Sequence, residues 1–234
     1  MYYTPHDIAR EVLRLGFLPF FQGEIEGFSI EENISPDYWF PEGDGVEGVW
    51  EWKNDIIVDA DCAYGKFYQG KACFVSMEWF PLLATWRRAH HTLTPDEQLV
   101  LDTVRSHGSL LSREIKKMCG YTAPSRRLHG NALERAAQKD NVTKKASVKK
   151  GYETTITRLQ MGCQLVSAGF EYSYTRDGRR YGWSVTRYCT PEDFFGAERM
   201  QVKESPDECR RLLQEHLSHA LPQASPTQIT QLIG

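Results

Sequence analysis

Between residues 94 and 188, the signals that start and stop helices come in an order that leaves few folds open. The run TPDEQLVLDTVRSHG predicts a helix that begins at a capping box of Thr94 and Glu97 and ends at Gly108. SLLSREIKKMCG predicts a second, shorter helix with Ser112 as its N-cap. GYETTITRLQMG, with its apolar residues at helical spacing, predicts a third.

A strand and a β-hairpin follow these three helices. CQLV predicts the strand, and GFEYSYTRDGRRYGWSVTRY predicts the hairpin. Three helices, a strand and a hairpin make up the order of a winged helix-turn-helix domain. In such a domain the third helix enters the major groove of DNA and the hairpin forms the wing.

The turn of the hairpin is predicted at Asp177-Gly178, because a type I′ turn needs positive φ at both central positions. That register places Arg176 opposite Arg179 at the tip, next to Arg180. It turns an aromatic face toward the core, with the pairs Tyr174/Tyr181, Tyr172/Trp183 and Phe170/Val185. An aromatic base with an arginine tip suits a wing on a phosphate backbone. The alternative is a solvated hairpin whose arginines keep a strand edge soluble.

Lysine and arginine are concentrated in the same part of the chain. Residues 104–188 hold 17 Lys and Arg against 6 Asp and Glu, whereas residues 1–103 hold 7 against 18, so a net charge of −3 hides a basic block. Such a block is typical of a polyanion-binding module. The alternative is that it docks on the acidic N-terminal half. Residues 122–150 form a basic insertion, long for a helix connection, which we expect to become ordered on a partner.

Six Ser-Pro and Thr-Pro dipeptides mark helix starts, since proline fits the first helical position after a capping hydroxyl. They predict a helix over 5–16 and helices in the C-terminal tail. A β-rich block, VWEWKNDIIV and CAYGKFYQGKACFVS, has a predicted turn at Gln69-Gly70 and precedes a helix over 77–88. The predicted fold is α+β. It comprises an acidic N-terminal α/β region (1–92), a basic winged-helix domain (93–190) and a helical C-terminal tail (191–234).

Several classes of protein are disfavoured. No apolar run approaches the ~18 residues of a membrane span, and MYYTPHDIAR lacks the basic and apolar regions of a secretory signal. Six widely spaced cysteines without a CxxC indicate free thiols in a reducing compartment. Nucleotide-binding, serine hydrolase and zinc protease motifs are absent, and His90-His91 alone is a weak metal signal. We expect a cytoplasmic, bacterial protein without a metal, a small-molecule cofactor or a membrane partner; its oligomeric state stays open.

Three runs of the chain carry a likeness to a known family. They are GSLLSREIKKMCGY, ITRLQMGCQLVSAGFEYSYTRDGRRYGWSVTRYCTPEDFF and KACFVSMEWFPLLATWRR. They resemble the winged-helix DNA glycosylases of the AlkZ/YcaQ-like family, and the WEWK, AYGKF and EWFP blocks bring the chain nearest to an AlkZ-related branch. The likeness covers most of residues 1–200. It implies binding to double-stranded DNA, removal of alkylated bases and unhooking of interstrand crosslinks.

The resemblance also implies a catalytic pair. The family carries Gln-x-Gln or Gln-x-Asp near its N-terminal helix, and the best match is Gln22-Gly23-Glu24, which departs from the pattern in its final Glu. Cleavage of an N-glycosidic bond passes through an oxocarbenium-like state and needs a polar oxygen to activate water. Glu24 would hold that water and Gln22 would position it. The alternative is that both residues lie in a solvated loop.

Two aromatic segments leave alternatives open. Trp50-Glu51-Trp52-Lys53 alternates like a strand, which favours core packing with a surface ion pair over a base-stacking pocket. Trp86-Arg87-Arg88 either grips phosphate or stabilises a helix C-terminus.

The leading prediction is a DNA-binding protein of the winged-helix glycosylase type. Base excision by N-glycosidic hydrolysis at Gln22 and Glu24 would make it a monofunctional glycosylase. The first alternative is a non-catalytic nucleic-acid-binding or regulatory protein, and the second is an interaction protein whose basic block is masked by its acidic half. The residues expected to contact DNA are Lys149, Lys150, Arg158, Arg176, Arg179 and Arg180.

Overall fold

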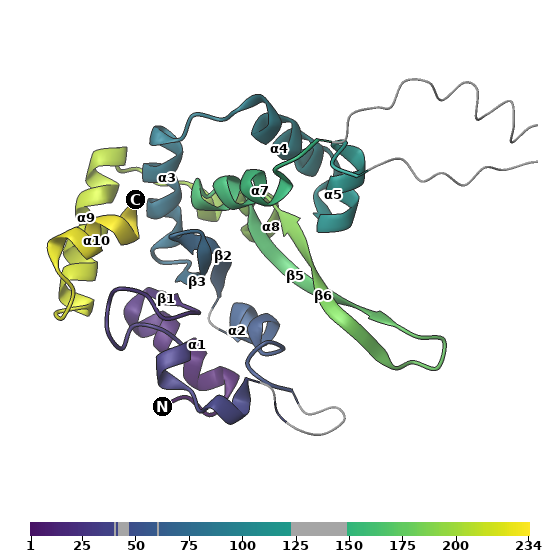
Figure 1. The fold of residues 1–234 in the computed structure, drawn as a ribbon. Coiled ribbons are helices and arrows are strands. Elements are labelled where there is room, and N and C mark those ends of the chain that lie inside the picture. The colour runs from purple at the N-terminus through teal and green to yellow at the C-terminus, as the bar shows by residue number, and fades with distance from the viewer. Residues whose placement is uncertain (40, 42–46, 60, 123–148) are drawn as a thin grey trace, which may run out of the picture.

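The structure is a computed structural model that describes residues 1–39, 41, 47–59, 61–122 and 149–234. Two small antiparallel sheets of three strands each, with helices packed around them, confirm the predicted α+β class (Figure 1). Within these ranges no helix is long and apolar enough to cross a bilayer. Most of the predicted insertion at 122–150 lies outside the described residues.

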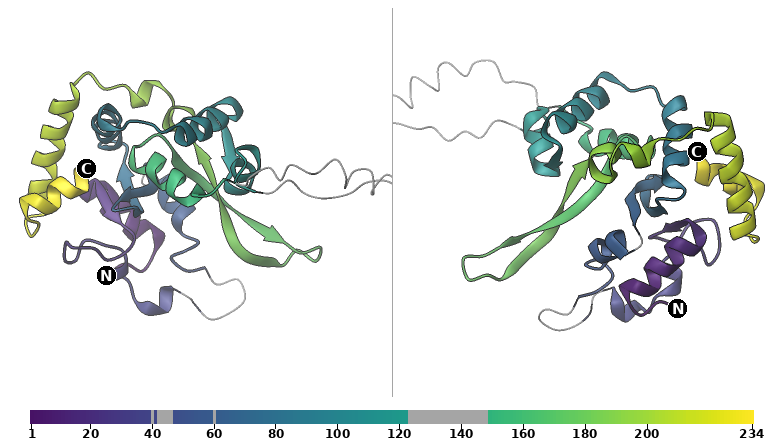
Figure 2. Two further views of the ribbon diagram at one scale, coloured as in Figure 1. Left: turned by 45° about the horizontal axis from the view of Figure 1, so that its top comes forward. Right: turned by 180° about the vertical axis from the view of Figure 1, so that it is seen from behind.

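The first sheet, in the order β1-β3-β2, shares its core with helices from both ends of the chain. Its elements are α1 (Pro5–Leu15), β1 (Phe17–Pro19), α2 (Lys53–Asp59), β2 (Cys62–Tyr68), β3 (Lys71–Ser76), α3 (Phe80–His90), α9 (Pro206–Ala220) and α10 (Pro226–Ile233), with 3-10 helices at Glu31–Asn33, Pro36–Tyr38 and Glu198–Met200. The predicted helix at 5–16 is confirmed as α1, which runs from a capping box of Thr4 and Asp7 to Gly16 at φ +76°. From the C-terminal part of the chain, α9 packs against α3 (Figure 2).

The β2–β3 hairpin turns at Gln69-Gly70 as predicted, with φ of +50° and +69°. The strand prediction for WEWK was wrong. Trp50 and its neighbours lie in a turn, and α2 begins at Lys53. The Glu51 carboxylate accepts a hydrogen bond from the amide of Gly48 at 3.1 Å, which closes a helix-entry turn that an extended strand cannot make.

The second sheet, in the order β4-β6-β5, has a core of its own. Its elements are α4 (Pro95–His107), β4 (Ser109–Leu111), α5 (Ser112–Met118), α7 (Tyr152–Met161), β5 (Val166–Tyr174) and β6 (Arg180–Cys189), followed by α8 (Pro191–Phe195). The capping box at Thr94 and Glu97 is confirmed. Ser112 is the first residue of α5 and not its N-cap. The sequence analysis missed β4, the strand that ends at Leu111, and so placed the N-cap one residue too late. The amide of Leu111, which precedes Ser112, donates to the Glu114 carboxylate at 2.8 Å.

The β5–β6 hairpin forms where it was predicted but in a different register. Tyr174 pairs with Arg180 rather than with Tyr181. Asp177 lacks the positive φ of a type I′ turn, which only Gly178 adopts, at +77°. A three-residue loop that ends in a left-handed glycine therefore replaces the predicted two-residue turn.

The predicted aromatic face does not reach the core along the outer half of this hairpin. Trp183 is 77% exposed, Tyr174 61% and Tyr181 56%. Only Phe170, nearer the start of β5, packs against the first core. The reason is geometric, because the hairpin extends beyond the body of the molecule and has no core beneath its end (Figures 1 and 2).

All six cysteines are buried, and none is bonded to another, which confirms the prediction of free thiols. Burial raises the pKa of Cys73 to about 12 and that of Cys189 to about 11. These thiols are therefore protonated at neutral pH and serve as small apolar side chains of the two cores.

The two cores meet where α7 lies against β2. Gln160 is buried, and its Oε1 accepts the amide hydrogen of Lys66 at 3.0 Å, while the Lys66 ammonium donates to the Thr157 hydroxyl at 3.1 Å. A side chain at Gly65 would place its Cβ 2.9 Å from that same Oε1. Glycine at this position is therefore what allows the helix to approach the strand.

Arg87 ties these parts together. It is 8% exposed, and its guanidinium donates only to backbone carbonyls: to Phe67 at 2.8 Å, Met161 at 3.0 Å, Leu232 at 2.9 Å and Ile233 at 2.7 Å. These carbonyls end β2, α7 and α10. Helix C-termini carry partial negative charge, so a buried cation is compensated there without a carboxylate.

We expect Arg87→Ala to lower the free energy of unfolding by about 3–5 kcal/mol, since it leaves four buried carbonyls without a donor. Arg87→Lys should cost less, because an ammonium can satisfy some of them. Arg211→Ala is the control: Arg211 pairs with two carboxylates on the surface, and its loss should cost under about 1 kcal/mol. Urea denaturation followed by fluorescence measures all three. This account would be contradicted if Arg87→Lys were as stable as the wild type and Arg87→Ala lowered the free energy of unfolding no more than Arg211→Ala.

Candidate nucleic-acid interface

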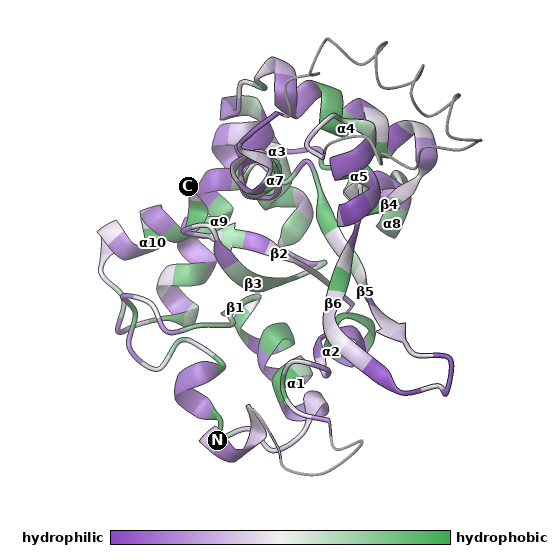
Figure 3. Cartoon of the chain, turned by 45° about the vertical axis from the view of Figure 1, so that its right-hand side comes forward, coloured by the Kyte–Doolittle hydropathy of each residue, from purple (hydrophilic) through white to green (hydrophobic). Residues whose placement is uncertain are grey.

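Two of the predicted DNA-contacting arginines stand free at the tip of the β5–β6 hairpin. Arg176 and Arg179 are exposed, and neither forms an ion pair with any residue in the described part of the chain. The Thr175 hydroxyl accepts from the amide of Arg179 at 3.1 Å and fixes the backbone of the loop. The tip of the hairpin is hydrophilic and lies away from the body of the molecule (Figure 3).

Arg180 points back toward that body instead. It donates to the Glu51 carboxylate at 3.1 Å and lies 4.2 Å from the centre of the Tyr172 ring. The Tyr172 hydroxyl also donates to Glu51, at 3.4 Å. Glu51, Tyr172 and Arg180 form a group, here called the clasp, that holds the hairpin against the N-terminal region and neutralises the Arg180 charge.

Lys53 lies beneath the clasp in an apolar setting. It is 7% exposed, and its ammonium lies 4.2 Å from the centre of the Phe170 ring and 5.0 Å from that of Trp50. Burial lowers the pKa of Lys53 to about 8, while the nearby Glu51 acts in the opposite direction. Cation–π contacts also favour the charged form. A buried amine that titrates near neutral pH therefore lies at the point where the hairpin meets the body.

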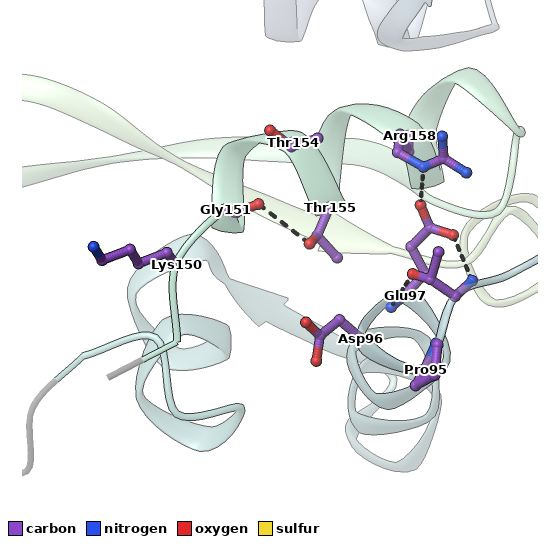
Figure 4. Close-up of a pocket in the computed structure, with 9 residues that line it drawn as sticks. Pro95, Asp96, Glu97, Lys150, Gly151, Thr154, Thr155 and Arg158 are labelled. Carbon is purple, nitrogen blue, oxygen red and sulfur yellow. Dashed lines mark hydrogen bonds and ion pairs between the residues drawn. The ribbon is translucent and has the colours of Figure 1, made fainter. Parts of the chain in front are cut away.

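Lys150 and Arg158 line a hollow of about 500 Å³ between the N-terminal ends of α4 and α7 (Figure 4), and Lys149 pairs with Asp96 of its lining at 2.6 Å. Arg158 pairs with Glu97. Lys150 is exposed and forms no ion pair with a described residue. Five of the six predicted cations therefore form two separate groups, one at the hairpin tip and one at this hollow, and Arg180 belongs to neither.

Glu97 is the acidic centre of the hollow. It is 1% exposed, and it accepts from the amide of Thr94 at 2.8 Å and from Arg158, with a ring nitrogen of His91 at 3.4 Å. Burial alone would raise the pKa of this carboxyl, but the Thr94 amide and the Arg158 guanidinium outweigh it and lower the pKa. Glu97 stays ionised and offsets part of the positive charge of α7.

The predicted catalytic pair lies elsewhere, in the loop after β1. Gln22 and Glu24 are exposed. The Gln22 side chain donates to Glu32 and the Glu24 carboxylate accepts from Gln69, both at 3.4 Å. The carbonyl of Glu24 accepts from Gln228 of α10 at 2.6 Å. Neither residue lines the hollow between α4 and α7 or a second one, of about 210 Å³, between α3 and α10.

For Trp86-Arg87-Arg88, the structure favours a role at helix C-termini over a phosphate-binding role. Both arginines turn inward: Arg87 binds helix-end carbonyls, and Arg88 pairs with Glu192 and donates to the carbonyl of Cys163 at 2.7 Å. They therefore do not form a phosphate grip. The sequence analysis missed the clasp, although Glu51, the one charged residue between the tryptophans of WEWK, could have indicated it.

The buried ammonium of Lys53 should reduce stability at neutral pH. A pKa lowered from about 10.4 to about 8 means that the folded protein binds fewer protons than the unfolded chain between those values. Its cost is therefore present in full below pH 8 and disappears as the pH rises toward 10. We expect Lys53→Met to be more stable than the wild type at pH 7 by about 1–3 kcal/mol, with the difference shrinking toward pH 10. Denaturation at several pH values measures it, with the exposed Lys203→Met as a control that should show no such trend. Lower stability of Lys53→Met at pH 7 would mean that the cation–π contacts dominate.

The comparison with known families gave one result. A family model described as "AlkZ related" matches residues 2–234, which is nearly the full chain. Neither the comparison with curated proteins nor that with solved structures gave a match. The matched residues include those of the hairpin, the clasp and the loop of Gln22. The chain belongs to the AlkZ-related family.

Proposed function

We propose that this protein binds double-stranded DNA through a winged helix-turn-helix domain formed by residues 93–190. Its three helices would be α4, α5 and α7, and its wing the β5–β6 hairpin. It would stand between an N-terminal region of residues 1–92 and a C-terminal tail of residues 191–234. One observation carries the proposal: Arg176 and Arg179 are exposed and without described ion pairs at the end of a hairpin that extends from the body.

The contacts would be made mainly to phosphates. The two arginines at the tip of the wing offer charge-assisted, bidentate hydrogen bonds to phosphate oxygens. At the N-terminus of α7, Lys150 and the first helical amides attract an anion together. Arg158 would contribute less, because its charge is already shared with Glu97.

We further propose that Gln22 and Glu24 excise a base by hydrolysis of its N-glycosidic bond, as family membership suggests. Glu24 would accept a proton from water at the sugar, and the Gln22 amide would orient that water. The hydrogen bonds that now occupy the two side chains are both 3.4 Å long and are therefore readily exchanged for contacts with a substrate. The reaction needs only water and no cofactor.

A binding protein without catalysis is the second candidate. Three of the six predicted DNA contacts are already paired with acids of residues 1–103: Lys149 with Asp96, Arg158 with Glu97 and Arg180 with Glu51. Such pairing weakens the field that a phosphate backbone experiences. Such pairing favours modest, regulated binding of DNA. If all cations of the basic block were paired in this way, the acidic half of the chain would mask the block from DNA.

Replacing the two arginines of the tip should weaken duplex binding and reduce its dependence on salt. For Arg176→Ala/Arg179→Ala we expect the slope of log K against log salt to fall by about 2, because each phosphate contact contributes about 0.9. Arg10→Ala/Arg211→Ala is the matched control, since it removes the same charge from α1 and α9. Fluorescence anisotropy with one labelled duplex at several salt concentrations gives both slopes. Equal slopes for the two double variants would mean that the wing does not contact the DNA. If the wild type did not bind at all, the result would favour the alternative in which the acidic half masks the basic block.

Catalysis is tested on duplexes that carry alkylated purines or an interstrand crosslink. We expect abasic sites, seen as strand breaks after alkaline treatment, and we expect Gln22→Ala/Glu24→Ala to abolish them. The control is Glu26→Ala/Gln223→Ala, which alters a neighbouring contact of the same loop. Breaks that survive in Gln22→Ala/Glu24→Ala would locate the site elsewhere. Salt-sensitive binding without breaks on any substrate would favour the non-catalytic protein.

A further inference from the structure

We propose that the outer part of the β5–β6 hairpin, centred on Trp183, is a stacking site for an unpaired nucleobase of DNA. The proposal rests on the proposed function, in that the wing must bind DNA, and it adds what the wing recognises. The expected ligand is a duplex with a base displaced from its stack, rather than a perfect duplex.

The exposure of the aromatic side chains is the first observation. Trp183, Tyr174 and Tyr181 lie within the outer half of one two-stranded hairpin, and each has more than half of its surface exposed. Single exposed apolar residues are common on protein surfaces, but an indole ring that is 77% exposed on a narrow ribbon is unusual, and Tyr174 and Tyr181 lie beyond it toward the tip on opposite faces of the ribbon. Rings presented on a positively charged surface are the usual platform for unpaired bases, because every base offers a flat face to stack.

Trp183 is also one end of a continuous row of rings. Its ring centre lies 6.4 Å from that of Trp50, which in turn lies 5.9 Å from Phe21 and 5.6 Å from Trp39. These last three rings are half-buried. We call Phe21, Trp39, Trp50 and Trp183 the aromatic row. It leads from the hairpin to the residue that directly precedes Gln22.

The distance of Trp183 from the tip of the hairpin favours stacking on a displaced base over intercalation of the side chain between stacked base pairs. The loop at the tip is Arg176-Asp177-Gly178, which is charged and carries no apolar group. Trp183 is five residues behind Gly178, or about 15 Å at the rise of a strand. If the tip contacts the phosphate backbone, Trp183 lies too far back to enter a base step and meets only a base that has left the stack.

The charges around the row fit a nucleotide as its occupant. Arg176 and Arg179 can hold the flanking phosphates, and the clasp fixes Trp183 in place by anchoring Arg180 on the same strand. Trp50 and Trp183 meet at an interplanar angle of 71°, and Trp183 stays 77% exposed beside Trp50, which leaves ring surface available for stacking. An apolar peptide would have no use for two guanidinium groups on the same hairpin that form no ion pair with a described residue.

The test compares two duplexes of the same sequence, one perfect and one with a single bulged base. Stacking on one aromatic ring should make the wild type bind the bulged duplex about tenfold more tightly. Trp183→Ala should lose this preference while its affinity for the perfect duplex stays within about twofold, and Trp183→Phe should keep most of it. Arg176→Ala/Arg179→Ala should weaken both complexes and preserve their ratio. Phe194→Ala, an exposed aromatic on α8 at the far end of β6, is the control and should behave as the wild type.

Photocrosslinking gives a second, direct readout. With 5-iododeoxyuridine as the bulged base, irradiation should attach the DNA to the tryptic peptide YGWSVTR, which contains Trp183. Equal binding of both duplexes by the wild type, or a preference that survives in Trp183→Ala, overturns the stacking site while leaving duplex binding intact. No binding to either duplex overturns the proposed function, and the stacking site with it.

Discussion

The guanidinium of Arg87 is the contact on which the arrangement of the molecule depends. It joins the end of β2, the end of α7 and the end of α10, which no other described side chain does at once. α7 leads directly into β5 and so into the hairpin, while α10 carries Gln228, which holds the loop of Glu24. Burying a guanidinium costs several kcal/mol. That cost is offset here because the carbonyls at the helix ends already carry partial negative charge and need a donor. One buried cation therefore sets the hairpin and the proposed catalytic loop in a common frame.

The charges that remain unpaired matter more for binding than the net charge. An overall charge of −3 would discourage binding to DNA if it were spread evenly. Instead, acids from the N-terminal half neutralise particular cations of the basic block, at the clasp and at the hollow between α4 and α7. The two arginines beyond the reach of these acids lie at the tip of the hairpin. Among the predicted contacts, the pairing thus leaves Arg176 and Arg179 at the tip, and Lys150 at the hollow, without a described acid to offset their charge.

Sequence reasoning succeeded where signals are local. The helix start at Thr4-Pro5, the capping box at Thr94, the Gln69-Gly70 turn and the free thiols all follow from local sequence signals. It failed where tertiary geometry decides. The hairpin register depended on how a three-residue loop competes with a two-residue one, and WEWK became a turn because Glu51 bonds the Gly48 amide. The inward direction of Arg87 could not be predicted, because its four acceptors come from segments up to 146 residues away. For the candidate site, the sequence predicted which residues are cationic but not which of them are already paired.

The outer half of the hairpin combines little internal support with a large exposed aromatic surface. A two-stranded ribbon without a core beneath it is only marginally stable. The clasp is therefore what sets its direction, through Glu51, Arg180 and Tyr172. Holding the ribbon before a partner arrives reduces the conformational entropy that binding would otherwise lose. Glu51 thus has two opposed effects on the same interaction: it removes the charge of Arg180 from the field that DNA would meet, and it keeps Trp183 and the two arginines of the tip in position to meet it. Since Trp183, Tyr174 and Tyr181 remain mostly exposed in the folded protein, the balance between these effects is set by the partner that covers them.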